Sequence, residues 1–311
     1  MTIRTVAIVG TGIIGASWAA HFLAHGLSVV ATDPAPGAEA RLRAAVAERW
    51  PSLVRLGLKD GATPEALRFA ADPAAAVAAA DFVQENGPER LEVKRPLFAA
   101  LDAAARPEVV LASSSSGLLA SDIQAACARP ERVLIGHPFN PPHLIPLVEV
   151  VGGAATSAQA VATAMAFYAA TGKRPIHLRK EVAGHVANRL QAALWREAFG
   201  LVEQGVASVA DIDLAISHGP GLRWALLGPF LNLLLSGGEG GMRHLLDHLG
   251  PPMDAWWQDL AATRMTASVK EAVVAGSDSE IAGWDMAAVE RARDDLLIGL
   301  LQRKAAAEIL P

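Results

Sequence analysis

A histidine and a glutamate, His137 and Glu149, stand on two apolar, extended segments that a proline-rich loop joins. A return from one strand to the next would bring their side chains together. A carboxylate bound to one imidazole nitrogen fixes the tautomer and raises the basicity of the other nitrogen. The pair could then accept the proton of an alcohol. A histidine before Pro-Phe can equally be a hydrogen-bonded structural residue.

Near the N-terminus, three glycines predict a dinucleotide site. Gly10, Gly12 and Gly15 have GxGxxG spacing, follow the apolar stretch 6–9 and precede a stretch of helical length. The first permits a tight turn, the second lets the backbone approach a pyrophosphate, and the third lets helix and strand pack closely. Asp33 ends the next predicted strand, where a carboxylate accepts hydrogen bonds from both ribose hydroxyls. We therefore expect NAD rather than NADP.

The elements that must position these residues alternate between strands and helices as far as about residue 182. Residues 81–85 are expected to form the third strand, and later strands are expected to begin near residues 109, 133 and 147. A pair of helices, broken at Pro51 and Gly61, is expected between the second and third strands. The sequence predicts an α/β fold, with a Rossmann-type doubly wound NAD-binding domain in residues 1–182 and an all-α substrate and dimerisation domain in residues 183–311.

Polar residues gather where predicted strands end. Four serines occupy positions 113–116, and Glu89 and Lys94 follow the third predicted strand. Ligands of open α/β sheets bind at the carboxyl ends of the strands. Each feature also has a plain structural explanation, because serines fill loops and an exposed Glu or Lys is usually a solvated side chain.

Composition excludes several classes of function. The net charge of −5, with no basic stripe, makes nucleic acid an unexpected partner. Cys127 is the single cysteine and the nine histidines are scattered, so we expect no intramolecular disulfide and no metal site. The longest apolar stretch, residues 224–236, is interrupted by glycine and proline and is too short for a membrane span. We expect a cytoplasmic protein.

Five segments in order resemble the 3-hydroxyacyl-CoA dehydrogenase family over nearly the whole chain. They are the glycine turn with Asp33, the strand-end serines, HPFNP (137–141), LVEVV (147–151) and GHVANRL (184–190). The resemblance implies an enzyme that oxidises a 3-hydroxyl group with NAD.

The resemblance also implies roles for individual residues. His137 and Glu149 would be the catalytic base pair, and Ser116 and Asn188 would hydrogen-bond the reacting oxygen. Further cofactor contacts are expected from five residues: Ile13, Ile14, Glu89, Lys94 and Asn140.

The substrate expected from the resemblance is a free hydroxy acid. Family members that use CoA are basic in the segment after the second strand, whereas residues 34–72 hold one lysine, Lys59, beside several arginines. The segment LRWALL (222–227) resembles the branch that oxidises free acids. L-carnitine is the first expectation, and L-gulonate or a CoA ester is the alternative.

Carnitine makes chemical demands that the sequence can meet. Its quaternary ammonium favours aromatic faces, such as Trp195, Trp224 and Phe230, and its carboxylate favours a guanidinium, such as Arg196 or Arg223. The aromatic residues can equally belong to the core and the arginines to surface ion pairs.

Two further expectations concern assembly and a different class of function. A helical domain with long apolar faces often pairs with its twin, so we expect a homodimer. The free-acid branch also resembles a lens crystallin, so an NAD-binding protein without turnover is the alternative in a different class. The joint presence of His137, Glu149, Ser116 and Asn188 argues against it.

Overall fold

The structure is a computed structural model that describes residues 2–307. It separates into two compact units, residues 1–189 and residues 190–311. The first contains every strand of the described chain, and the second is helical. The predicted α/β class, with a Rossmann-type unit followed by helices, is confirmed.

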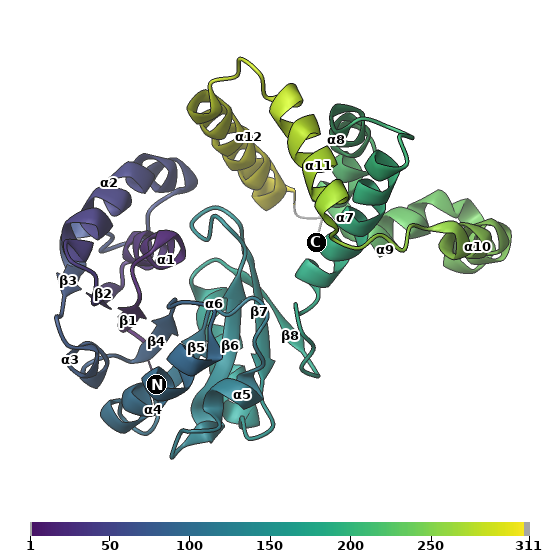
Figure 1. The fold of residues 1–311 in the computed structure, drawn as a ribbon. Coiled ribbons are helices and arrows are strands. Elements are labelled where there is room, and N and C mark those ends of the chain that lie inside the picture. The colour runs from purple at the N-terminus through teal and green to yellow at the C-terminus, as the bar shows by residue number, and fades with distance from the viewer. Residues whose placement is uncertain (1, 308–311) are drawn as a thin grey trace. The chain divides into compact units, whose positions relative to one another are not determined.

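An eight-stranded sheet forms the centre of the first unit, in the order β3-β2-β1-β4-β5-β6-β7-β8 (Figure 1). Neighbouring strands are parallel except for β6 and β7, which are antiparallel. The strands are β1 (Thr5–Val9), β2 (Ser28–Thr32), β3 (Leu67–Phe69), β4 (Phe82–Glu85), β5 (Val110–Ser113), β6 (Val133–Pro138), β7 (Leu147–Gly152) and β8 (Arg174–Leu178). The central strands are largely apolar and buried, as strands covered on both faces must be, and their polar residues lie near the carboxyl ends.

Helices cover both faces of this sheet, so the first unit has a doubly wound α/β fold. One hydrophobic cluster joins it to α1 (Ile13–Ala24), α2 (Ala38–Leu56) and α6 (Ala158–Ala170), and contains a stack of Trp18 on Phe22 at 5.0 Å. A second cluster joins the opposite face to α3 (Pro73–Ala78), α4 (Leu91–Ala104) and α5 (Ala120–Gln124). Each buried aromatic side chain contributes about 1.5–3 kcal/mol, so these two clusters fix the sheet on which the site is built.

The prediction of a pair of helices after β2 is wrong. One helix, α2, runs through Pro51 and ends at Leu56, before Gly57, whose φ of 101° only glycine adopts readily. After a turn and a 3-10 helix (Pro64–Ala66), the chain forms β3, which pairs with β2 at the edge of the sheet. The buried Leu67 and half-buried Phe69 alternate with the exposed Arg68, which is the period-two pattern of a strand and not that of a helix. Residues 81–85 therefore contain the fourth strand.

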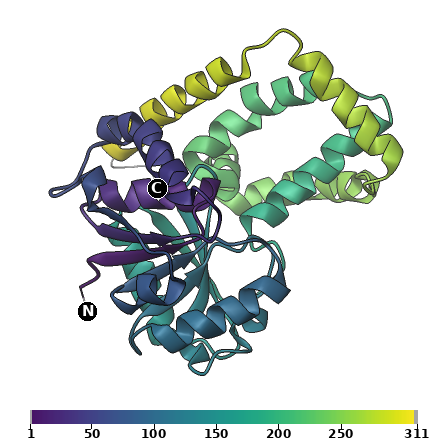
Figure 2. The same cartoon turned by 60° about the vertical axis from the view of Figure 1, so that its left-hand side comes forward.

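Helices make up the second unit throughout its described part (Figure 2). They are α7 (Ala187–Glu203), which begins in the first unit, α8 (Val209–His218), α9 (Pro220–Ser236), α10 (Gly241–Asp259), α11 (Ala267–Glu280) and α12 (Met286–Ala306). Gly228 (φ 74°) and Pro229 kink α9 in its middle. Within residues 2–307, no helix is long and apolar enough to cross a membrane.

Candidate active site

His137 and Glu149 face each other across the antiparallel pair β6 and β7. They are direct Cα partners in the ladder, and Nδ1 of His137 lies 2.9 Å from Oε2 of Glu149. Both residues are buried, with 4% and 0% of their surface exposed. The predicted convergence of the two side chains is therefore present, and it is held by the sheet itself.

The second carboxylate oxygen of Glu149 is also occupied. Oε1 accepts hydrogen bonds from the backbone amides of Val186 (2.9 Å) and Ala187 (3.0 Å), where α7 begins. Burial alone would raise the pKa of Glu149, but the hydrogen bonds from His137 and the two amides hold it below its usual value. The ionised carboxylate accepts a hydrogen bond from the N–H group of Nδ1. Nε2 is therefore the nitrogen with a free lone pair, which could accept a proton from a substrate.

A serine loop, residues 114–117, lies close to this pair and is organised by Glu89. Oε1 of Glu89 accepts hydrogen bonds from the Ser115 hydroxyl (2.6 Å) and from the amides of Ser116 (2.9 Å) and Gly117 (2.8 Å). Burial would raise the pKa of Glu89, but these hydrogen bonds lower it. Glu89 therefore supports the loop as an anion, and its predicted contact with a cofactor stays a prediction.

Ser116 and Asn188 are brought together by the fold. The Asn188 side-chain amide donates to the Ser116 carbonyl over 3.4 Å, and Ser116 is exposed. Asn188 is the second residue of α7, directly after Ala187, whose amide binds Glu149. Four predicted catalytic residues thus lie on segments that hydrogen bonds and strand pairing tie together.

The glycine turn has the shape that a pyrophosphate requires. Gly10 has φ 87°, and a Cβ on Gly15 would lie 1.9 Å from the carbonyl oxygen of Gly10. A Cβ on Gly12, in contrast, would meet no atom within 4 Å. Helix α1 starts here without a side-chain cap or an acidic residue in its first turn. Its free amides and the open side of Gly12 fit a phosphate group.

Ile13, Ile14 and Asn140 have different surroundings. Ile13 is 69% exposed at the first turn of α1, and Ile14 is half-buried behind it. Asn140 is exposed in the loop after β6. Their predicted cofactor contacts stay predictions.

Asp33 follows β2 and is held by the glycine turn. Its Oδ2 accepts from the Thr11 amide (2.7 Å) and hydroxyl (3.0 Å), and Oδ1 accepts from the Ala35 amide (2.9 Å). These hydrogen bonds outweigh burial and lower the pKa of Asp33. An ionised carboxylate at this position suits ribose hydroxyls and repels a 2′-phosphate.

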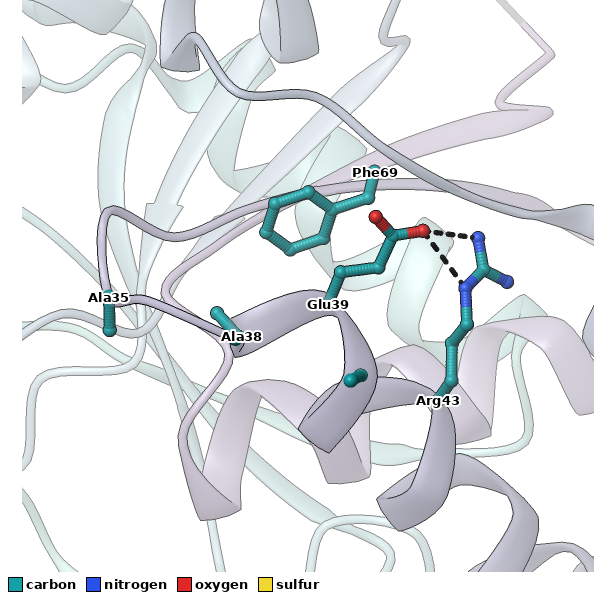
Figure 3. Close-up of a pocket in the computed structure, with 7 residues that line it drawn as sticks. Ala35, Ala38, Glu39, Arg43 and Phe69 are labelled. Carbon is teal, nitrogen blue, oxygen red and sulfur yellow. Dashed lines mark hydrogen bonds and ion pairs between the residues drawn. The ribbon is translucent and has the colours of Figure 1, made fainter.

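A surface hollow of about 490 Å³ adjoins the loop that carries Asp33 (Figure 3). Its wall includes Phe69 and the first two turns of α2, where Arg43 and Glu39 form an ion pair of 2.8 Å. The guanidinium of Arg43 therefore already has a carboxylate partner at this half-exposed wall.

Lys94 is buried, contrary to the common expectation for a lysine on a helix. Its Nζ lies 2.8 Å from both carboxylate oxygens of Glu85 and 3.2 Å from the carbonyl oxygen of Gly87. Glu85 also accepts from the Ser113 hydroxyl at 2.6 Å. Sequence analysis missed Glu85, although an acid that ends an apolar strand, DFVQE, is a usable signal. The contacts of Lys94 are structural, and its contact with a cofactor stays a prediction.

Both parts of the chain match one family. Residues 5–182 match the 3-hydroxyacyl-CoA dehydrogenase NAD binding domain, and residues 184–273 match the C-terminal domain of the same enzyme. The chain belongs to the 3-hydroxyacyl-CoA dehydrogenase family. It is an NAD-dependent dehydrogenase, as the sequence predicted.

Relatives within the 3-hydroxyacyl-CoA dehydrogenase family match almost the full chain. L-carnitine dehydrogenase of Streptomyces coelicolor is 53% identical over 96% of this chain and 94% of its own length. The enzyme of the same name from Pseudomonas aeruginosa is 52% identical over 96% and 93%. A solved 5-formyl-3-hydroxy-2-methylpyridine 4-carboxylic acid 5-dehydrogenase is 32% identical, with a TM-score of 0.86 over 99% of this chain and 100% of that chain.

One solved enzyme that is named for a CoA ester matches a smaller share of the chain. The structure of Escherichia coli 3-hydroxybutyryl-CoA dehydrogenase is 31% identical, with a TM-score of 0.64 over 80% of this chain and 53% of that chain.

Proposed function

We propose that this protein oxidises the 3-hydroxyl of L-carnitine to 3-dehydrocarnitine with NAD. The choice of L-carnitine as substrate rests on sequence identity, at about half of all positions, to enzymes named L-carnitine dehydrogenase. This identity extends over both units of the chain. The observation that carries the chemistry is the buried hydrogen bond between His137 and Glu149. L-gulonate and a 3-hydroxyacyl-CoA ester are the alternative substrates.

The proposed reaction removes a proton and a hydride from one carbinol. Bound NAD supplies the hydride acceptor. Nε2 of His137 takes the hydroxyl proton as the C–H bond breaks and the C=O bond forms, and Glu149 stabilises the imidazolium. Ser116 and Asn188 orient the oxygen, which supplies positioning and preorganised polarity. The proton on His137 then passes to solvent.

Aromatic residues of the second unit support a cationic substrate. Trp195, Trp224 and Phe230 are 50%, 41% and 75% exposed in the single chain, so none of them is a core residue there. Aromatic faces attract a quaternary ammonium, and a desolvated contact of this kind is worth about 2 kcal/mol. Arg196 or Arg223 would bind the carboxylate.

Parallel assays test the substrate. NAD reduction is followed with L-carnitine, L-gulonate and 3-hydroxybutyryl-CoA at equal concentrations, and we expect turnover with L-carnitine at least tenfold above the other two. Activity on the CoA ester alone would overturn the free-acid proposal. Tight binding of NADH without oxidation of any of the three would instead favour the crystallin-like alternative.

We further propose a cytoplasmic homodimer in which residues 183–311 carry substrate recognition and pairing. The helices of the second unit expose large apolar side chains, among them Leu235 (68%), Trp256 (62%) and Trp257 (65%). Exposed large apolar side chains in such numbers are typical of interfaces. Sedimentation at micromolar concentration tests it, and a monomer alone would contradict the dimer.

A further inference from the structure

His185 has an unusual backbone conformation directly before α7. Its φ is 51°, the only positive value of a non-glycine residue within residues 2–307. A non-glycine residue in this region is strained and persists where the surroundings require it. The turn at His185 points the next two amides, of Val186 and Ala187, at Oε1 of Glu149. The backbone of His185 therefore helps to fix the partner of the catalytic base.

The ring of His185 connects two other parts of the same site. Its Nε2 lies 3.0 Å from the carbonyl oxygen of Ser115, and its centre lies 5.1 Å from that of the His137 ring. A carbonyl oxygen can only accept, so Nε2 carries the proton. The ring therefore spans the distance from the serine loop to His137.

The other nitrogen of His185 is left without a partner. Nδ1 is buried and has no hydrogen bond, and the residue is 1% exposed. Burial lowers the pKa of His185, more than the hydrogen bond to Ser115 and the nearby Glu149 and Glu89 raise it. His185 is consequently a neutral imidazole with one defined tautomer. A cation here would oppose the imidazolium that forms on His137 during oxidation.

We propose that His185 is a positioning residue that joins the serine loop to the pair of His137 and Glu149. It sets the position of Ser116 relative to Nε2 of His137. The inference rests on the proposed function, because that function assigns Ser116 and His137 to the same reacting hydroxyl. His185 touches neither reacting atom. Its donor, Nε2–H, keeps the loop in register, and its neutral ring fills the space beside His137.

Three substitutions separate the donor, the ring and the backbone. His185→Gln keeps an N–H donor near the position of Nε2, His185→Phe keeps the ring and loses the donor, and His185→Asn suits the positive φ but is too short to reach Ser115. With L-carnitine we expect kcat to fall about 10- to 100-fold in the Phe and Asn variants and by less than about fivefold in the Gln variant. The Kd for NADH should stay within about twofold in all three.

A deuterium label adds a readout that a purely structural role would not move. With L-carnitine deuterated at C3, the isotope effect on kcat should increase in the Phe variant, since a displaced Ser116 slows hydride transfer itself. Equal kcat losses in the Gln and Phe variants would overturn the proposal. An isotope effect unchanged from that of the unsubstituted enzyme would overturn it as well.

Hydrogen exchange tests the link without turnover. Amides of residues 115–118 should exchange about tenfold faster in the Phe variant than in the unsubstituted protein, and near the normal rate in the Gln variant. Equal exchange in all variants would overturn the link even if L-carnitine is oxidised. If the unsubstituted protein leaves L-carnitine untouched while the exchange pattern is as expected, the substrate proposal fails and the link stands.

Discussion

Glu149 binds His137 from the directly opposite position of the neighbouring strand, at 2.9 Å from Oε2 to Nδ1. Two paired strands, rather than a loop, therefore set the distance and angle between the imidazole of His137 and the carboxylate of Glu149. Strand pairing resists displacement because residues 134–138 of β6 and 148–152 of β7 form one continuous antiparallel ladder. The hydrogen bond from Nδ1 defines one tautomer of the imidazole, so the proposed proton transfer to Nε2 would need little reorganisation.

The first prediction concerns His137. His137→Ala should lower kcat about 10²- to 10⁴-fold, because general-base assistance of the proton transfer is lost. NADH binding should be unchanged within about twofold, since the glycine turn follows β1 and His137 lies on β6. Stopped-flow turnover and fluorescence titration of NADH measure the two effects. A near-normal rate in this variant would show that His137 is not the base.

The second prediction concerns the two oxygens of Glu149. One accepts from His137 and the other from the Val186 and Ala187 amides. Glu149→Gln has a single acceptor oxygen, so its NH₂ group must face one of these donors. We expect kcat to fall about 100-fold and the free energy of unfolding to fall by about 1–3 kcal/mol. Urea unfolding and steady-state rates check both, and a loss of stability without a loss of rate would contradict the catalytic role.

Much of the site could be predicted because its residues sit next to strong local signals. GxGxxG follows an apolar strand, and Asp33 and the serines end strands, so their common edge of the sheet follows from parallel topology. Pairing of His137 with Glu149 followed from two strands and a short connection. These inferences need only period and position.

Other features depended on contacts between distant segments. The ion pair of Lys94 with Glu85 and the bridge from His185 to Ser115 join residues 9 and 70 positions apart. No local pattern distinguishes a buried lysine from a solvated one on an amphipathic helix. Strand β3 was missed because three residues are too few to display alternation against a helical background.

The third prediction follows from the buried ion pair. Glu85 and Lys94 have side chains that are 0% and 1% exposed, so removing one partner leaves a charge without compensation. Lys94→Met should lower the free energy of unfolding by about 3–5 kcal/mol. Arg43→Met, in the exposed pair with Glu39, is the matched control and should cost less than about 1 kcal/mol. Similar losses in the two variants would contradict this account.

The fourth prediction is a dependence of stability on pH. Lys173 is buried over the Trp18 ring at 5.0 Å and donates to the carbonyl oxygens of Ile145 (3.1 Å) and Pro142. Burial lowers the pKa of Lys173 to about 7 from an ordinary value near 10.5. Between pH 7 and 9 the unfolded chain thus binds the proton that the folded chain has released, so stability rises with pH.

Urea unfolding at pH 7, 8 and 9 measures this effect. The contribution of Lys173 approaches about 1.4 kcal/mol per pH unit at most. Lys173→Met removes the titrating group and should flatten the rise over this interval. The same slope in the variant as in the unsubstituted protein would assign the effect to other groups.

The last prediction separates two glycines of the same turn. A Cβ at position 15 would lie 1.9 Å from the Gly10 carbonyl oxygen, whereas a Cβ at position 12 would meet nothing within 4 Å. Gly15→Ala should therefore force α1 away from β1 and lower the free energy of unfolding by about 1–3 kcal/mol. Gly12→Ala leaves the folded chain undisturbed but puts a methyl group where the pyrophosphate must approach, so the Kd for NADH should rise roughly tenfold or more. Thermal unfolding and NADH titration of both variants give the comparison. A stable Gly12→Ala variant that binds NADH normally would show that the phosphates bind away from this turn. The proposed position of the nicotinamide beside His137 would then be wrong as well.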